Sequence, residues 1–239
     1  MITVFAHRGA ESIAPENTEI AFKTALEYGA AAIELDVQLT KDNVPVVVHD
    51  YKLKRYNKDA KLAVNQYTFD ELQSIDVGTY FDAKFAGAKI PSLKSVLQFI
   101  PDHIIINIEI KNSPVPHKGI ERQVARLAEQ YYNLDNIIVS SFDHTALLRI
   151  SECNPDIKLG FLMHYPMINA GRYVSMTGLN AVSVHPFKKI TDAAFIEECH
   201  KYGLKVYPYT VKSQKEADRL VKLGADGFFT SQETLYEIN

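Results

Sequence analysis

The sequence predicts an α/β fold, a (β/α)8 TIM barrel with a small insertion after the second barrel strand. Short β-branched runs alternate with helical patterns along the chain, which is typical of βαβ units and a parallel sheet. Eight such units fit the 239 residues, close to the usual barrel length of about 250. A doubly wound open sheet is the structural alternative, because the strand signals near 157–184 are weak.

The expected elements follow each other in regular order. Barrel strands are expected at 2–6, 32–37, 104–110, 136–141, 157–162, 180–184, 205–209 and 226–229. Helices are expected at 17–28, 92–99, 117–132, 143–153, 167–177, 191–202, 213–223 and 231–238. Asn17 or Thr18 can cap the first helix, and Gly29 marks its end. Ser213 followed by Glu216 fits a capping box.

The stretch 44–91 breaks this alternation. Residues 44–48 are expected to form an extra strand that ends at His49 and Asp50. A polar, lysine-rich stretch, a short helical piece at 68–74 and an aromatic loop at 78–81 follow it. Long βα loops are usually functional or form a lid. Because no linker or internal repeat is present, we interpret 1–239 as one domain with an insertion at about 51–90.

Composition excludes several partners and compartments. The formal net charge is −3, so there is no bulk electrostatic argument for nucleic acid or an anionic membrane. Cys153 and Cys199 show no paired spacing and are expected to be reduced thiols. No apolar run approaches the roughly 20 residues of a membrane span, and no signal peptide is recognisable. We therefore expect a cytoplasmic protein without a stable membrane anchor.

Three carboxylates stand at strand spacing within apolar runs. Glu34 and Asp36 flank Leu35, and Glu109 lies in the run at 104–110. Side chains two residues apart in a strand point to one face, and charges are costly in a sheet interior unless they bind something. Carboxylate oxygens suit Ca²⁺ or Mg²⁺, whereas zinc prefers more His or Cys ligands. The alternative is that Glu34 and Asp36 form surface ion pairs at a sheet edge.

Histidines and cations end neighbouring strands. His7 and His49 are suited to general acid–base work, because two histidines on different loops can face each other across a phosphate. Arg8 can clamp phosphate oxygens and Lys111 can add a point charge. The alternatives are that Arg8 pairs with Glu16 and that Lys111 pairs with Glu109 or Asp36.

All of these candidates fall at the carboxyl ends of their expected strands, His49 after the extra strand and the others at barrel strands, where barrel active sites form. The segment 15–18 has an ordinary explanation in helix capping, and it would also bring Glu16 near the pocket as an orienting residue. No Walker, dinucleotide-binding or Gly-x-Ser-x-Gly motif is present. The residues thus indicate a divalent-metal site that handles phosphate.

These residues lie in motifs that give the chain a family resemblance. The chain resembles the glycerophosphodiester phosphodiesterases in the segments 6–9, 15–18, 33–37, 40–42, 46–50, 91–93, 108–111, 140–142, 209–211 and 224–227. The matches span nearly the whole chain in the family's order. Tyr209 departs from the family's usual Trp, keeping an aromatic wall of different size with an added hydroxyl.

The resemblance implies a metal-dependent hydrolysis of glycerophosphodiesters to glycerol 3-phosphate and an alcohol. It implies that His7 and His49 are the acid–base pair, and that Ca²⁺ or Mg²⁺, with Mn²⁺ as a further candidate, is the cofactor. The implied metal ligands are Glu34, Asp36 and Glu109, and the implied substrate-binding residues are Arg8, Lys111, Glu16 and Tyr209. Two routes stay open, attack by the substrate's own 2-hydroxyl or by water.

Two alternative functions are weighed against this one. A related barrel phosphodiesterase would cut lysophospholipids or other alkyl phosphodiesters, and would need an apolar groove that Tyr80, Phe81 and Phe85 could line. A non-catalytic phosphate-ester binder would not need two proton-transfer groups. The expected partner is a small-molecule substrate, and a homodimer is expected only as a common arrangement among soluble enzymes.

Overall fold

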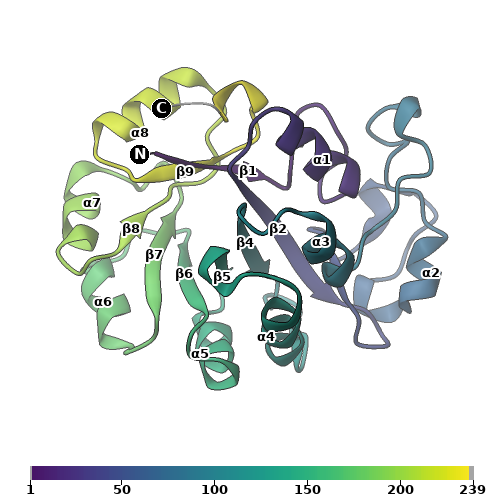
Figure 1. Ribbon diagram of the computed structural model, residues 1–239, viewed down its shortest axis with the longest axis horizontal. Helices are drawn as coiled ribbons and strands as arrows, with labels where there is room; N and C mark the ends of the chain where they lie inside the picture. The colour runs from purple at the N-terminus through teal and green to yellow at the C-terminus, as the bar shows by residue number, and fades with distance from the viewer. Residues whose placement is uncertain (1, 237–239) are drawn as a thin grey trace.

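A barrel of parallel strands surrounded by helices confirms the predicted fold class (Figure 1). The computed structural model describes residues 2–236. Neighbouring strands follow in the order β8-β7-β6-β5-β4-β2-β1-β9. The barrel strands are β1 (Thr3–His7), β2 (Ala32–Leu39), β4 (Ile105–Ile110), β5 (Ile137–Ser141), β6 (Lys158–Met163), β7 (Ala181–Pro186), β8 (Lys205–Val206) and β9 (Gly227–Thr230).

The barrel closes between β9 and the chain that follows β8. The strand expected at 205–209 is regular only over Lys205–Val206, because Pro208 has no N–H to donate. Backbone hydrogen bonds still join the two segments: Asp226 N to Val206 O at 3.1 Å, Phe229 N to Pro208 O at 3.0 Å and Val211 N to Phe229 O at 2.8 Å. The alternative of an open doubly wound sheet is therefore wrong.

Helices on the outside connect successive strands. They are α1 (Glu19–Glu27), α3 (Leu93–Phe99), α4 (Ile120–Tyr131), α5 (His144–Cys153), α6 (Ala170–Met176), α7 (Ala193–His200) and α8 (Gln214–Lys222), and the 3-10 turn η4 (Leu134–Asn136) precedes β5. Each of these α-helices lies inside the range predicted for it and is slightly shorter than that range. The reason is that capping residues belong to the helix pattern in the sequence but have extended backbone, as at Thr18 and Ser213.

The cap predictions are confirmed in part. Of the two candidates, Thr18 caps α1, accepting a hydrogen bond from Ala21 N at 3.2 Å. Ser213 Oγ accepts a hydrogen bond from Glu216 N at 3.4 Å. The reciprocal bond does not reach Ser213 N, because the carboxylate of Glu216 accepts from Lys212 N at 2.8 Å and from Lys188 Nζ at 2.7 Å. The backbone bond is thus shifted by one residue, and an ion pair is added to it.

The helix expected at 231–238 is wrong where it can be compared. Only the 3-10 turn η5 (Glu233–Leu235) forms, and 237–238 lie outside the described residues. Tertiary contacts decide the backbone here. Leu235 and Tyr236 are both buried, and the hydroxyl of Tyr236 donates to Gly9 O at 3.2 Å. The end of the described chain is thus anchored beside the loop that follows β1.

The extra strand expected at 44–48 is β3 (Pro45–Val47), which pairs antiparallel with the outer end of β2. The segment 51–90 then packs beside α1 and α3 at one side of the barrel (Figure 1). It contains η1 (Leu53–Arg55), η2 (Val64–Gln66), α2 (Phe69–Gln73) and η3 (Ala83–Phe85). Its small hydrophobic core includes Leu53, Val64, Leu72 and Ile90 and is separate from the main one.

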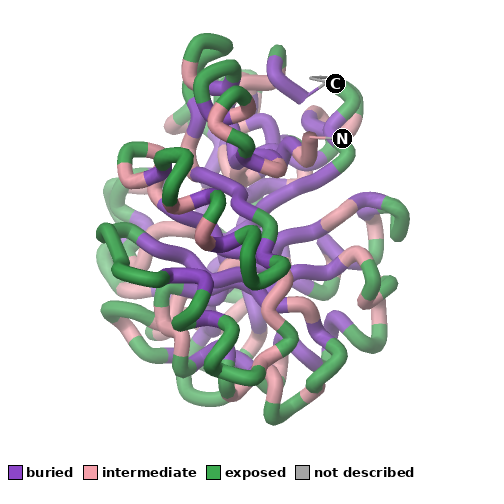
Figure 2. Tube along the Cα trace, turned by 90° about the vertical axis from the view of Figure 1, so that its left-hand side faces the viewer, coloured by how far each residue is buried: buried purple, intermediate pink, exposed green. Residues whose placement is uncertain are grey.

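Burial follows the barrel, with buried strands at the centre and exposed loops and helix faces outside (Figure 2). All eight residues of β2 are buried, the charged ones included. Inside the barrel the rings of Phe5 and Phe229 stack at a centroid distance of 4.7 Å, and Tyr207 packs edge-on against Phe5 at 5.2 Å. This apolar plug fills the interior, so the open end above it is left for a site.

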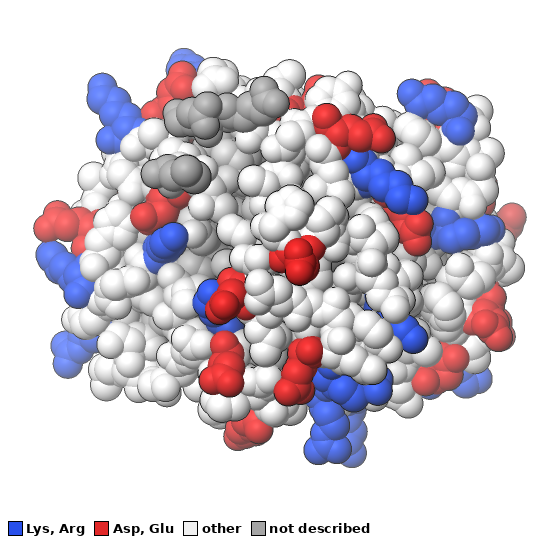
Figure 3. Space-filling view, viewed as in Figure 1, with Lys and Arg blue, Asp and Glu red and all other residues white. Residues whose placement is uncertain are grey.

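Charges of both signs are interspersed over the face shown in Figure 3, in keeping with the small net charge. Among residues 2–236, no helix combines the length and the apolar character that crossing a membrane requires.

Candidate active site

A pocket of about 210 Å³ opens at the carboxyl ends of the barrel strands. His7 is the last residue of β1, Lys111 follows β4, and His49 follows β3. The pocket is lined by His7, Arg8, Glu34, His49, Asn107, Glu109, Lys111, Phe142, Leu162, Tyr209, Thr210 and Phe229. The structure thus brings most of the predicted site residues around one cavity. Asp36 and Glu16 do not line the pocket, although both contact Arg8.

Three carboxylates converge at the pocket. Oxygens of Glu34, Asp36 and Glu109 lie within 4.8 Å of one another. Glu34 and Asp36 share one face of β2, and Asp36 pairs in register with Glu109 of β4. Their side chains are 4%, 1% and 13% exposed, so surface ion pairs at a sheet edge are excluded. Such a set of hard oxygens fits a divalent cation.

The surroundings shift the pKa values of two of these carboxylates in opposite directions. Burial, together with the nearby Asp36 and Glu109, raises the pKa of Glu34 well above its ordinary value. Burial alone would also raise the pKa of Asp36, but Arg8 and Lys111 outweigh it and lower that pKa. Asp36 is therefore the charged centre of the cluster, and the charge on Glu34 is costly without a further cation.

In the loop after β1, the backbone N–H and the side chain of Arg8 both contact the carboxylates of β2. Arg8 (φ 55°) and Gly9 (φ 79°) adopt left-handed backbone, which is uncommon for a residue other than glycine. The Arg8 N–H donates to Glu34 Oε2 at 2.9 Å, and its Nε lies 3.1 Å from Asp36 Oδ2. A Cβ on Gly9 would lie 2.7 Å from the carbonyl carbon of Ala21, so only glycine fits this turn.

Both cations of the site have carboxylate partners. Arg8 Nη1 donates to Glu16 Oε1 at 3.2 Å. Lys111 Nζ donates to Glu109 Oε1 at 2.9 Å and lies 3.7 Å from Asp36 Oδ1. Burial would lower the pKa of Lys111, but Glu109 and Asp36 raise it. The ion-pair alternatives considered for Arg8 and Lys111 are present, and both residues also line the pocket.

The two pocket histidines are held in the same way. His7 Nδ1 lies 2.8 Å from Glu11 Oε1, and His49 Nδ1 lies 2.7 Å from Asp50 Oδ1. A carboxylate can only accept a hydrogen bond, so each Nδ1 is the donor, and each Nε2 is left without a hydrogen bond in the protein. Because both rings line the pocket, the free nitrogens are available to a ligand there.

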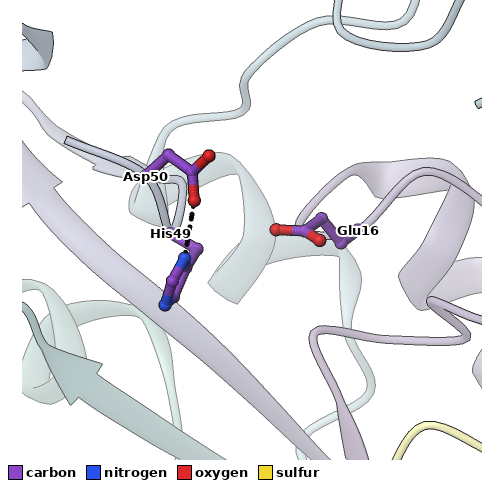
Figure 4. A group of neighbouring side chains, drawn as sticks. All are labelled: Glu16, His49 and Asp50. Atoms are coloured by element: carbon purple, nitrogen blue, oxygen red, sulfur yellow. Dashed lines mark hydrogen bonds and ion pairs between the residues drawn. The ribbon is translucent and has the colours of Figure 1, made fainter. Parts of the chain in front are cut away.

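Asp50 and Glu16 lie beside His49 (Figure 4), and two buried polar side chains hydrogen-bond to residues around the pocket. Gln38, fully buried on β2, donates from Nε2 to the backbone carbonyls of Val48, His49 and Asp50 at 2.9, 3.0 and 3.1 Å. This residue was missed at the level of sequence, although its place two residues after Asp36 continues the same strand face. The helix-capping explanation for the segment 15–18 also missed a role of Asn17 at the site. Its Nδ2 donates to Asp36 Oδ2 at 2.8 Å.

The opposite side of the pocket is apolar. Phe142 and Tyr209 pack edge-on at 5.8 Å, and Phe187 lies 5.9 Å from Tyr209. Burial and the nearby Glu109 raise the pKa of Tyr209, so its hydroxyl stays neutral. Phe142 and Leu162 were missed as lining residues, and Tyr80 packs inside the insertion instead. Only the motif at 140–142 could have pointed to Phe142.

Hard oxygen ligands, two cations and two histidines around one pocket define an enzyme site for phosphate esters. Residues 7–232 match the sequence model of the glycerophosphoryl diester phosphodiesterase family. A glycerophosphodiester phosphodiesterase of Caldanaerobacter subterraneus subsp. tengcongensis is 38% identical over 237 residues, covering 98% of this chain and 96% of that protein. One from Bacillus altitudinis is 37% identical over 236 residues, covering 96% and 94%.

Solved structures agree. A phosphodiesterase of Oleispira antarctica, determined in complex with the product sn-glycerol-3-phosphate, has a TM-score of 0.86 at 25% identity and covers 98% of this chain and 94% of its own. A glycerophosphodiester phosphodiesterase of Thermotoga maritima has a TM-score of 0.76 at 28% identity, covering 99% and 97%. The chain therefore belongs to the glycerophosphoryl diester phosphodiesterase family. It is an enzyme of that class, a phosphoric diester hydrolase that acts on glycerophosphodiesters.

Proposed function

We propose that this enzyme uses a divalent metal to hydrolyse glycerophosphodiesters to glycerol 3-phosphate and an alcohol, with His7 and His49 as its general acid and base. One observation carries the proposal. Both histidines line the pocket that contains Glu34 and Glu109, and each has Nδ1 against a carboxylate and Nε2 free. The glycerol-3-phosphate bound to the Oleispira antarctica relative supports the product.

Glu34, Asp36 and Glu109 would hold the metal. Among the described residues, Asp36 Oδ1 is buried and accepts no hydrogen bond, which is costly unless another cation is bound. The raised pKa of Glu34 indicates the same deficit of positive charge. The oxygen set suits Ca²⁺ or Mg²⁺, with Mn²⁺ as a further candidate. When bound, the metal would neutralise charge that develops on the phosphate.

The chain's own residues would move the protons. Hydrolysis breaks the bond between phosphorus and the oxygen of the leaving alcohol and forms one to the attacking oxygen. One histidine takes the proton of the nucleophile, and the other protonates the leaving alkoxide. Arg8 and Lys111 would bind the phosphate oxygens, and Tyr209 would form the wall beside the organic substituents. Glu16 would act on the substrate indirectly, by orienting Arg8.

The decisive experiment is one substrate panel run with several metals. Glycerophosphocholine and glycerophosphoethanolamine are assayed with Ca²⁺, Mg²⁺ or Mn²⁺, and again after full chelation by EDTA. We expect release of glycerol 3-phosphate that stops on chelation and returns when metal is added. Activity that survives full chelation would exclude the metal mechanism, and binding without turnover would favour a non-catalytic binder.

The apolar wall favours a second candidate function, cleavage of lysophospholipids or other alkyl phosphodiesters. Phe142 lines the pocket on the loop after β5 and is 42% exposed, and Tyr165 and Ile168 on the loop after β6 are 77% and 90% exposed. Such a rim would accommodate a hydrocarbon chain at the mouth of the site. A series of substrates with increasing acyl length separates the two candidates: kcat/KM that rises with chain length would make the alkyl phosphodiesters the preferred class.

Several properties stay predictions from the sequence. We propose that 1–239 forms one domain and that 51–90 is an insertion within it, which the separate small core of that segment supports. A cytoplasmic location and a homodimer are further predictions, to be tested by fractionation and by light scattering.

A further inference from the structure

Arg55, supplied by the insertion, joins two carboxylates behind the pocket. Its Nε and Nη2 donate to Asp50 Oδ2 and Oδ1 at 2.7 and 3.1 Å. Its Nη1 and Nη2 donate to Glu16 Oε2 and Oε1 at 3.0 and 2.7 Å. Both interactions are bidentate, the arrangement in which a guanidinium fixes the orientation of a carboxylate as well as its charge.

These two carboxylates belong to different parts of the active site. Asp50 accepts from Nδ1 of His49 at 2.7 Å. Glu16 accepts from Nη1 of Arg8 at 3.2 Å. A continuous chain of charge-assisted hydrogen bonds therefore runs from His49 through Asp50, Arg55 and Glu16 to Arg8. It links the proposed proton-transfer group to the proposed phosphate-binding group. His7 has no comparable support among the described residues, since its Nδ1 meets only Glu11.

The insertion holds Arg55 in place. The guanidinium carbon lies 4.4 Å from the ring centroid of Tyr56 and 5.8 Å from that of Tyr80, within cation–π range. The two rings pack edge-on at 5.0 Å, and Tyr56 also donates from its hydroxyl to Glu16 Oε1 at 2.9 Å. Tyr56 and Tyr80 of the insertion thus hold the guanidinium of Arg55 in one position.

The same cluster is not a second metal site. Glu16, His49 and Asp50 offer ligand atoms within 4.8 Å of one another (Figure 4), a spacing that would suit an ion. The guanidinium of Arg55 already binds both carboxylates, so the positive charge that such a cluster requires is part of the protein. The structure accordingly needs no external ion there.

We propose that Arg55 is a positioning residue of the reaction, through which the insertion holds His49 and Arg8 in register across the pocket. The inference rests on the proposed catalytic role of His49. Without Arg55, Asp50 loses its orientation and no longer fixes the His49 ring with Nε2 toward the substrate. Glu16 at the same time loses two of its donors, so it no longer fixes the Nη1 end of Arg8 for contact with the phosphate.

Steady-state kinetics of Arg55→Ala and Arg55→Lys test the proposal. Loss of a group that orients a metal-ligating histidine typically costs about 10- to 100-fold. By analogy we expect Arg55→Ala to lower kcat by about that factor, with a smaller change in KM. Lys should retain part of the rate, because it keeps the charge but not the bidentate geometry. Guanidinium ion, added far below denaturing concentrations, should restore part of the kcat of Arg55→Ala, because it can bind between Asp50 and Glu16 where the side chain of Arg55 is missing.

Arg149 offers a matched control. It also bridges two carboxylates, Glu121 at 2.7 Å and Asp143 at 3.0 Å, and is 42% exposed against 41% for Arg55. Arg149→Ala should keep the wild-type kcat and show no response to guanidinium. An equal loss in Arg55→Ala and Arg149→Ala, or a loss that guanidinium leaves unchanged, would reduce Arg55 to a structural role and overturn the proposal.

A fourth variant separates this inference from the proposed function. If His49→Asn is fully active, the proposed role of His49 fails. If His49→Asn is inactive while Arg55→Ala has the wild-type kcat, only the positioning role fails. Should Arg55→Ala not fold, Asp50→Asn and Arg55→Lys take its place: non-additive losses of kcat in the double variant support the relay, and additive losses overturn it.

Discussion

The two sides of the barrel mouth carry opposite chemistry. Strands β1 to β4 and the residues that follow them present carboxylates, histidines and cations. In contrast, β5, β6, β9 and the chain after β8 present Phe142, Leu162, Phe229 and Tyr209. The charged side is tied down by paired groups, because a buried ion without a partner is costly. The apolar side needs no such pairing and reaches the surface through exposed rings. We therefore propose that the bond-breaking step takes place at the first side and that the second side selects the alcohol.

Removing a proton-transfer group from the charged side should have the largest effect. We expect His7→Asn and His49→Asn each to lower kcat by about 10²–10⁴-fold, the usual contribution of general acid–base catalysis. Phe142→Ala, on the apolar side, should mainly raise KM. Steady-state assays on glycerophosphocholine measure both. If Phe142→Ala lowers kcat as much as the histidine variants do, the division between the two sides is wrong.

A divalent cation should stabilise the charged side measurably. The pKa of Glu34 is raised above its ordinary 4.5, so its contribution to stability is present below pH 4.5 and is lost as pH rises through the folded pKa. At neutral pH a bound cation should restore it. At 100 times its Kd the cation should add about 2.7 kcal/mol to the free energy of unfolding.

Thermal unfolding with Ca²⁺ or Mg²⁺ measures this stabilisation, and Glu34→Gln is the control that should respond less. An unfolding temperature that does not change with either ion in the wild-type protein would contradict the metal assignment.

The apolar side contains a titratable group that should make the fold sensitive to acid. Burial lowers the pKa of His185 from 6.5 to about 3, and Ser183 Oγ is its one hydrogen-bond partner among the described residues, at 2.8 Å from Nε2. Between pH 6.5 and about 3 the unfolded chain binds a proton that the folded protein does not. This group should therefore lower stability by about 1.4 kcal/mol for each unit that the pH falls within that window.

Urea unfolding at several pH values compares the wild-type protein with His185→Gln, which lacks the titrating ring. The variant should show a shallower decline of unfolding free energy below pH 6.5. Equal slopes for the two proteins would mean that His185 is accessible to protons in the folded state.

The smallest effect is expected from the hydroxyl of Tyr209. It lies 3.3 Å from Met163 O and 3.4 Å from His164 Nδ1, both long hydrogen bonds. Loss of one such bond is worth about 0.5–1.5 kcal/mol at most, so Tyr209→Phe should change KM by less than about tenfold and leave kcat unaltered. A large loss of kcat would move Tyr209 to the catalytic side of the comparison.

The periodicity of side chains along the strands made the position of the site predictable from the sequence. The period of two in β2 and β4 sets Glu34, Asp36 and Glu109 on inward faces, and the parallel order brings the strand ends together at one mouth. The insertion was equally visible, because 51–90 interrupts the alternation of strands and helices. In contrast, the helix expected at 231–238 failed, since contacts of Leu235 and Tyr236 with the barrel override local propensity.

The barrel, the strand order and the gathering of charged residues at its open end could therefore be predicted, since they depend on short-range patterns repeated along the chain. Which charges pair depends on the packing of distant segments and became known from the folded structure. Arg55 meets Glu16 across 39 positions of sequence, and the wall of Phe142 and Tyr209 joins segments 67 positions apart. No periodic signal encodes such contacts, because they depend on how separate loops pack above the barrel.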